Sequence, residues 1–279
     1  MTTHLQGQPR RRANAIDGSM LARVAAALAI GLGLCVASQR ASAQVEQWAP
    51  GVAVNLSHGI LGTDTGVAPS SVGYQGRKER KVYDRRVSKN ITINAYVFKV
   101  TWPNGATAEG ILNPEFGSSA NARQALDQFL PAVGRLPFCL RSKVDELVIH
   151  KGDEAYGGGG NGLLLYAGRA RYGEPEYDEI VVHEAAHNLG QQIQDSQAWK
   201  NAQSADKAQD GSGRQGYISV YARDNPSRED VSESFLAWLL LRKRNDRLSA
   251  GERAYIEGTI PNRLQYFDAM ACNTHPVGL

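Results

Sequence analysis

Five consecutive residues, His183-Glu184-Ala185-Ala186-His187, limit most strongly what this chain can fold into. In a helix, residues four apart lie on the same face, so the segment predicts that His183 and His187 point in one direction. Two imidazoles spaced in this way can bind one tetrahedral zinc ion, and Glu184 is placed to accept a proton from a water molecule on that metal. The segment therefore predicts a metal-binding helix with a built-in general base.

The residues around this segment are typical of a helix that faces a hydrophobic core. Asp178 and Glu179 stand in its first turn, the apolar run 180–182 follows, and Gly190 is predicted to end the helix. The simpler interpretation is a chance match on an ordinary surface helix, because the pattern fixes only three residues. Two histidines and a glutamate on so apolar a helix are costly to bury without partners, which favours the metal site.

A catalytic zinc ion needs three protein ligands, so a third must come from elsewhere in the chain. One version of the motif continues to a third histidine, but Ile193 stands at that position here. The better candidate is a helix over 226–241, which Ser227 can cap and which is apolar on every side from Phe235 onward. This helix is therefore predicted to be a core helix that carries the third ligand.

Glu229 and Glu233 lie one turn apart on one face of this second helix. We expect Glu229 to be the third ligand, and Glu233 to accept a hydrogen bond from the far nitrogen of a ligand histidine and so fix its tautomer. The assignment with Glu233 as the ligand stays open. The alternative to both is a solvated first turn, in which the helix dipole favours acidic residues.

The order of these motifs along the chain resembles that of the gluzincin metallopeptidases. His183–His187 is followed by Tyr221-Ala222-Arg223 and then by Glu229-Asp230-Val231-Ser232-Glu233-Ser234-Phe235. The chain is similar in this respect to the catalytic domain of anthrax lethal factor and to its secreted zincin-like relatives. The similarity covers residues 177–238 and implies a zincin-like fold.

The resemblance also implies a role for each residue of the motifs. Zinc is expected on His183, His187 and Glu229, with Glu184 as the general base. Tyr221 is expected to donate a hydrogen bond to the developing oxyanion. Tyr221 is spaced from Glu229 slightly differently from the family pattern, so Tyr217 remains a rival for that role.

The first 43 residues read as a secretory signal rather than as part of the fold. A basic region precedes the apolar run 24–37, and the small residues Ala41-Ser42-Ala43 follow as a cleavage site. The apolar run is too short to span a membrane, so no stable membrane anchor is expected. The mature protein is predicted to be secreted or periplasmic and to begin near Gln44, although Met20 is an alternative start codon.

The charge of the chain gives no support for nucleic acid or a membrane surface as a partner. The formal charge of +3 is mostly that of the leader, which holds five Lys/Arg and one Asp, and its removal leaves 26 basic and 27 acidic residues. A nearly neutral exported domain gives no reason to expect binding to nucleic acid or to a membrane surface. The expected partner is a peptide or protein substrate, and the oligomeric state is left open.

Two cysteines, Cys139 and Cys272, remain in the predicted mature chain. In an oxidising compartment they are expected to form a disulfide bond. The bond would close a long loop and stabilise the fold by roughly 4–5 kcal/mol on chain entropy alone. The alternative is a pair of buried free thiols.

The remainder of the chain predicts an α+β domain over 91–279 with a small twisted mixed sheet packed on the metal helix. Strands are expected at 91–102, 106–112, 144–150 and 163–166, and a helix interrupted by Pro131 at 121–133. Strand 163–166 is the candidate edge for pairing with an extended peptide.

Two polar segments of the chain are predicted to lack regular structure. Residues 44–90, with the basic run 75–81, are expected to form a polar N-terminal arm or edge region, and whether it is a propeptide is left open. The glycine-rich segment 157–162 lacks the Gly-Lys-Ser/Thr ending of a phosphate-binding loop and is expected to be a mobile turn beside the substrate cleft.

These features predict a secreted, zinc-dependent endopeptidase in which a glutamate base acts on a zinc-activated water molecule. One alternative is a zinc hydrolase acting on a non-peptide amide of the cell-wall type. The other is a non-catalytic exported protein that uses a zincin-like fold for binding. Glu184 argues against the second alternative, since binding alone does not need a base.

Overall fold

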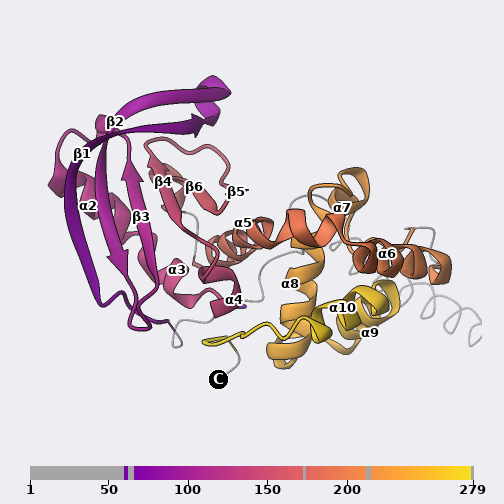
Figure 1. The fold of residues 1–279 in the computed structure, drawn as a ribbon. Helices are drawn as coiled ribbons and strands as arrows, with labels where there is room; N and C mark the ends of the chain where they lie inside the picture. The colour runs from indigo at the N-terminus through magenta and orange to yellow at the C-terminus, as the bar shows by residue number, and fades with distance from the viewer. Residues whose placement is uncertain (1–59, 62–65, 172–173, 212–214, 278–279) are drawn as a thin grey trace, which may run out of the picture. The chain divides into compact units, whose positions relative to one another are not determined.

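The structure is a computed structural model that describes residues 60–61, 66–171, 174–211 and 215–277 (Figure 1). The chain divides into two compact units, Met1–Gln44 and Val45–Leu279, and all described residues belong to the second. The predicted signal peptide therefore lies outside the described residues. Among the helices that are described, none is long and apolar enough to cross a membrane.

The described chain has the predicted α+β class and contains a six-stranded mixed sheet in the order β1-β2-β3-β4-β6-β5 (Figure 1). Strands β1, β2 and β3 are antiparallel to one another, β3, β4 and β6 are parallel, and β5 is antiparallel to β6. The strands are β1 Ser71–Asp84, β2 Lys89–Thr101, β3 Thr107–Leu112, β4 Glu146–His150, β5 Gly157–Gly159 and β6 Gly162–Tyr166.

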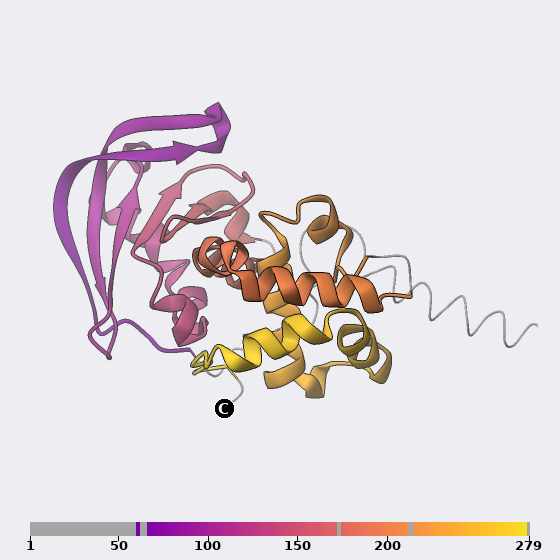
Figure 2. The ribbon, with the colours of Figure 1, turned by 45° about the vertical axis from the view of Figure 1, so that its right-hand side comes forward.

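Four strands follow the predicted segments closely, because their apolar residues are patterned for burial. In β2, Tyr96, Phe98 and Val100 enter the main core, whereas Ala95 and Val97 belong to a smaller cluster on the other face. The two-residue alternation thus places apolar side chains on both sides of the sheet. The far end of the β1–β2 hairpin bends over β4 and β6 (Figures 1 and 2), where the backbone N–H of Arg85 donates to the Tyr166 hydroxyl.

Strand β1 corrects the prediction of an irregular arm before residue 90. Residues 71–84 form the longest strand of the sheet and pair with β2 along nearly their whole length. This strand was not predicted from the sequence because its side chains are largely charged and exposed and show no apolar alternation. Its register shifts between Tyr74 and Arg77, where Gly76 has a φ of +88°. β1 is an outer strand of the sheet, so residues 71–84 of the predicted arm form a regular edge of the sheet.

The helices between β3 and β4 are short. The predicted helix over 121–133 is divided into α2 Ser119–Asp127 and α3 Leu130–Arg135, and Pro131 lies in the first turn of α3. A third short helix, α4 Phe138–Arg141, carries Cys139. Cys139 is disulfide-bonded to Cys272 as predicted, with their Cα atoms 5.4 Å apart, a separation typical of disulfides.

Helix α5, Glu174–Asp195, carries the metal motif and is longer than predicted. Gly190 lies inside it and does not end it. A glycine in a helix costs only about 1 kcal/mol relative to alanine, which packing of the helix outweighs. The next helix, α6 Gln197–Gln209, begins at Ser196, whose hydroxyl accepts a hydrogen bond from the backbone N–H of Trp199.

The C-terminal part of the described chain is helical. It contains α7 Val220–Asp224, α8 Asp230–Lys243, α9 Ala250–Thr259, α10 Pro261–Ala269 and a 3-10 helix at Asn245–Arg247. Earlier in the described chain, 3-10 helices occur at Arg85–Val87, Pro114–Phe116 and Ala167–Arg171. Helix α8 packs against α5, and α10 packs against α6 (Figure 2).

Helix α8 is the predicted core helix, and its residues 230–241 are all buried. The predicted cap at Ser227 is wrong, because the helix begins two residues later than expected. Glu229 is its N-cap residue, and the backbone N–H of Glu229 donates to the carbonyl of Asn225. The first turn of α8 therefore holds the predicted third ligand against α5.

Candidate metal centre

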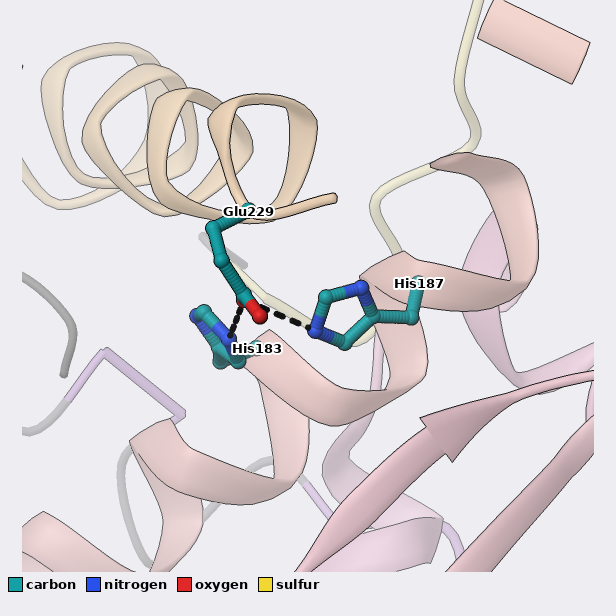
Figure 3. A group of neighbouring side chains, drawn as sticks. All are labelled: His183, His187 and Glu229. Atoms are coloured by element: carbon teal, nitrogen blue, oxygen red, sulfur yellow. Dashed lines mark hydrogen bonds and ion pairs between the residues drawn. The ribbon is translucent and has the colours of Figure 1, made fainter. Parts of the chain in front are cut away.

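Helix α5 presents His183 and His187 on one face, one turn apart, as the spacing predicts (Figure 3). Their ring centroids are 4.9 Å apart and their planes are nearly perpendicular. His183 is almost completely buried, and the side chain of His187 is 13% exposed. The pair of imidazoles is therefore largely enclosed by protein, and the exposed area that remains belongs mainly to His187.

Glu229 of the α8 first turn completes the cluster. Its Oε2 lies 3.2 Å from Nε2 of His183 and 3.2 Å from Nε2 of His187 (Figure 3). One ligand atom from each residue lies within 4.8 Å of the others. Two imidazole nitrogens and one carboxylate oxygen are the donor set of many catalytic zinc sites, which keep a fourth position open. The three residues therefore fit a metal ion, although the geometry does not identify the metal.

The two oxygens of Glu229 have different partners. Whereas Oε2 faces the histidines, Oε1 accepts hydrogen bonds from the Tyr221 hydroxyl at 2.9 Å and from Nε of Arg228 at 2.7 Å. Because Oε1 is engaged by two donors, the arrangement favours binding of a metal through Oε2 alone. Coordination through one oxygen leaves more room for water or substrate at the metal.

Glu233 lies one turn further along α8 and contacts the opposite side of the His183 ring. Its Oε1 is 3.0 Å from Nδ1 of His183, and its side chain is fully buried. A carboxylate at Nδ1 favours the tautomer that carries its proton there, which leaves Nε2 with a free lone pair for a metal. Glu229 thus faces the Nε2 atoms of both histidines, and Glu233 faces Nδ1 of His183.

The ionisation of the cluster depends on burial and on these contacts. Burial lowers the pKa of His183, but the carboxylates of Glu229 and Glu233 raise it more strongly, to about 10. Burial raises the pKa of Glu229, but its contacts with His183, His187 and Arg228 hold that pKa well below its usual range. These directions mean that the carboxylates of Glu229 and Glu233 favour a positive charge at the His183 imidazole.

Glu184 lies beside the three candidate ligands. It is 9% exposed, and its Oε2 is 3.9 Å from Nε2 of His187. The backbone at Glu184 also touches the outer strand β5, since a Cβ built on Gly158 would lie 1.7 Å from the Glu184 carbonyl oxygen. Only glycine can occupy position 158 in this arrangement. Glu184 thus has its carboxylate beside His187 and its backbone against the outer strand β5.

The structure separates the two tyrosines that were rivals for the oxyanion role. Tyr221 contacts the cluster, and burial raises its pKa, so its hydroxyl keeps its proton at neutral pH. Tyr217 instead lies with its ring 5.1 Å from the guanidinium of Arg263. Of the two, Tyr221 is the one placed to act at the candidate metal centre.

A buried ionic network that the sequence did not predict holds the start of α8. Arg263 donates from Nε to Asp230 at 3.0 Å and from Nη1 to Asp206 at 2.9 Å, and all three side chains are inaccessible to solvent. Gln203 also donates to Asp230, at 2.7 Å. Asp230 directly follows Glu229, so the network fixes the backbone of the third candidate ligand. No local signal links residues so far apart in the sequence.

No family model matches the chain, and no curated protein or solved structure matches it either. Function is therefore inferred from the side chains and their geometry. The cluster of His183, His187 and Glu229 can hold a metal ion, with Glu184, Tyr221 and Glu233 in contact with or beside it.

Proposed function

We propose that the protein is an exported, zinc-dependent endopeptidase with a zincin-like fold. The observation that carries this proposal is the convergence of Glu229 Oε2 on both Nε2 atoms, with Glu184 beside them. A buried carboxylate and two imidazoles explain metal binding, but Glu184 is not needed for that purpose. Its position is explained if a proton must be moved close to the metal.

A zinc ion held by His183, His187 and Glu229 would supply a Lewis acid and make water a nucleophile near neutral pH. Glu184 would take the proton of the attacking water and pass it to the leaving amine. Glu233 would hold the His183 ring in place through Nδ1. The Glu184 carboxylate 3.9 Å from Nε2 of His187 and the Glu233 carboxylate 3.0 Å from Nδ1 of His183 support these two roles.

Tyr221 has a second task in this proposal. Its hydroxyl has one proton, which it donates to Glu229 Oε1 in the present structure. To stabilise the oxyanion, the hydroxyl would have to leave Oε1 and donate to the substrate instead. Arg228 would continue to hold Oε1 during this exchange, because its Nε is 2.7 Å from the same oxygen. The carboxylate would thus stay oriented while the tyrosine acts on the substrate.

The sheet edge that would bind a peptide differs from the predicted one. Strand β6 is not the outer strand, since β5 pairs with its first residues through Gly157, Gly158 and Gly159. Because Gly158 packs on the backbone of Glu184, a peptide paired with β5 would run past the proposed base. We therefore place the substrate on β5 rather than on strand 163–166.

A digest of a peptide library tests the proposal and separates it from its alternatives. The zinc-loaded protein should cut peptides at internal bonds, and a chelator should stop the reaction. Cleavage of cell-wall amides but of no peptide would favour the non-peptide hydrolase. Tight peptide binding without turnover of any amide, in zinc-loaded protein, would favour a binding protein.

A further inference from the structure

A trough with a volume of about 320 Å³ lies on the face of the sheet that points away from α5. Leu163 and Leu165 of β6 are buried in the main core, and Leu164 between them alternates to the other face of the strand while still packing against that core. The trough is lined by Tyr83, Arg85, Glu146, Val148, Leu163, Leu164 and the glycines at 157–160 and 162. Its walls come from the sheet and from the end of the β1–β2 hairpin that bends over it.

The pairing register explains why the trough is open toward β5. Across three strands, Val148, Leu164 and Gly157 are direct neighbours, and so are Glu146, Gly162 and Gly159. Both rows thus end at β5 in a glycine. No side chain of β5 stands between its outer edge and Leu164, so the trough opens toward that edge.

The open end of the trough adjoins the proposed catalytic residues. Gly158 packs on the Glu184 backbone, and its neighbours Gly157 and Gly159 point to the trough side. A peptide paired with β5 would have its side chains pointing alternately to the metal helix and to the trough. Neighbouring strands are about 4.8 Å apart, so a large side chain opposite Gly159, where no described atom lies within 4 Å of an added Cβ, can reach across that glycine into the trough.

We propose that this trough is a specificity pocket that binds an aromatic side chain of the substrate, and this inference rests on the proposed peptidase function. Its floor offers Leu164 and the flat backbone of glycines. An aromatic side chain covers a neighbouring glycine in a sheet better than other side chains do. The volume of about 320 Å³ lies at the small end of the range for ligand pockets, about 300–1,000 Å³, and is large enough for one aromatic side chain.

The hairpin end adds two groups that suit an aromatic ring. Tyr83 is 44% exposed and presents its ring at the wall of the trough. The exposed guanidinium of Arg85 is held by the Tyr156 carbonyl, which accepts from Nη2 at 2.8 Å. A Cβ on Gly157 would lie 3.0 Å from that Nη2, so a ring crossing Gly157 would meet the guanidinium. Arginine planes stack well on aromatic faces.

The test uses zinc-loaded protein and a set of alanine-rich peptides in which one phenylalanine is moved along the sequence. We expect kcat/KM to rise about tenfold or more when phenylalanine occupies one position, as for a filled apolar pocket. Leu164→Trp should remove that advantage by filling the trough, so that the variant cleaves the phenylalanine peptide and the all-alanine peptide with similar kcat/KM. If the aromatic preference persists in Leu164→Trp, the phenylalanine is bound on the face of the sheet next to the metal helix and not in the trough.

Two further variants guard the test against misfolding. Thr92→Trp places the same side chain on an exposed position of β2, outside the trough, and should behave as wild type. Gly157→Ala adds one methyl group at the trough mouth and should reduce the phenylalanine advantage, by about threefold. Zinc content and thermal melting of all three variants should match wild type, so that a loss of preference cannot be a loss of fold.

The outcomes separate this inference from the function on which it rests. If the zinc-loaded protein cleaves no peptide, the proposed function fails and the pocket fails with it. If peptides are cleaved without any aromatic advantage, or Leu164→Trp behaves as Thr92→Trp does, only the pocket is overturned. A preference for lysine or arginine that Glu146→Gln abolishes would also overturn it, because recognition would then depend on the carboxylate.

Discussion

Strands β1 and β5, the two outer strands of the sheet, differ in length, in side chains and in what lies next to them. β1 has 14 residues, carries charges along its exposed side, and contains a bulge at Gly76. β5 has three residues, all glycine, and packs on the backbone of the metal helix at Glu184. Charges and bulges protect an outer strand from pairing with other chains. The charges and the bulge of β1 disfavour pairing with another strand, whereas β5 has neither charges nor a bulge.

The comparison extends to the ion pairs that support each side. Near β1, Arg80 pairs with Glu109, and both side chains are about 30% exposed. On the other side, α8 holds α5 in place, and Arg263 with Asp206 and Asp230 is wholly buried beneath it. Exposed pairs contribute little to stability, whereas a buried charge that loses its partner is costly. The proposed site thus depends on buried polar groups that tolerate little change.

Arg263→Met should have the largest effect on stability, because it leaves two carboxylates buried without a cation. We expect a loss of about 3–5 kcal/mol in the free energy of unfolding, measured by urea denaturation. Arg80→Met is the matched control on the β1 side and should cost less than about 1 kcal/mol. Equal losses in the free energy of unfolding would show that the buried Arg263 network and the exposed Arg80–Glu109 pair do not differ in their contribution to stability.

Gly158→Ala should have the next largest effect, because its Cβ would overlap the carbonyl oxygen of Glu184. Either β5 or α5 must move, and we expect a loss of about 1–3 kcal/mol in stability. Turnover should fall by about a hundredfold, since a displacement of about 1 Å at a catalytic group has that consequence. Gly190 lies in α5, and no described atom lies within 4 Å of a Cβ added there. Gly190→Ala should therefore stabilise the protein slightly instead. Normal turnover in Gly158→Ala would show that the packing of β5 on Glu184 does not matter for catalysis.

The β1 edge should show the smallest change in stability and a change in association instead. Glu79→Val combined with Lys81→Val keeps the net charge but removes two exposed charges from one face of the strand. We expect the free energy of unfolding to change by about 0.5 kcal/mol or less. Size-exclusion chromatography should reveal self-association, which the control Glu79→Gln with Lys81→Gln should lack. A monomeric valine variant would mean that charges do not protect this edge.

The sequence predicted best those parts of the fold whose pattern is local. The spacing of His183 and His187 and the continuous apolar run of α8 each fix one element without knowledge of the rest. Strand β1 escaped prediction because its stability comes from backbone pairing with β2 and not from apolar side chains. The glycines of β5 were read as a turn, because glycine weakens a strand unless something packs closely on it, as Glu184 does here.

The residues of the candidate metal centre could be predicted from the sequence, but the residues that hold them in place could not. Motif spacing pointed to His183, His187 and Glu229, which the structure brings together. Arg228 and Arg263 could not be found in this way. Their contacts with Glu229 and Asp230 depend on how α8 meets its neighbours, and neither has a spacing that singles it out. The helix end at Gly190 was mispredicted because tertiary packing overrides a weak local preference.

The most direct test of the central claim compares zinc content with peptide turnover in Glu184→Gln and Glu229→Ala. Glu184→Gln should bind zinc as wild type does, because the amide keeps the shape of the side chain. Its turnover should nevertheless fall by about a hundredfold or more, because the amide cannot accept the proton of water. Glu229→Ala should lose zinc and turnover together. If Glu184→Gln holds zinc and cleaves peptides at the wild-type rate, Glu184 is not the base and the peptidase proposal is contradicted.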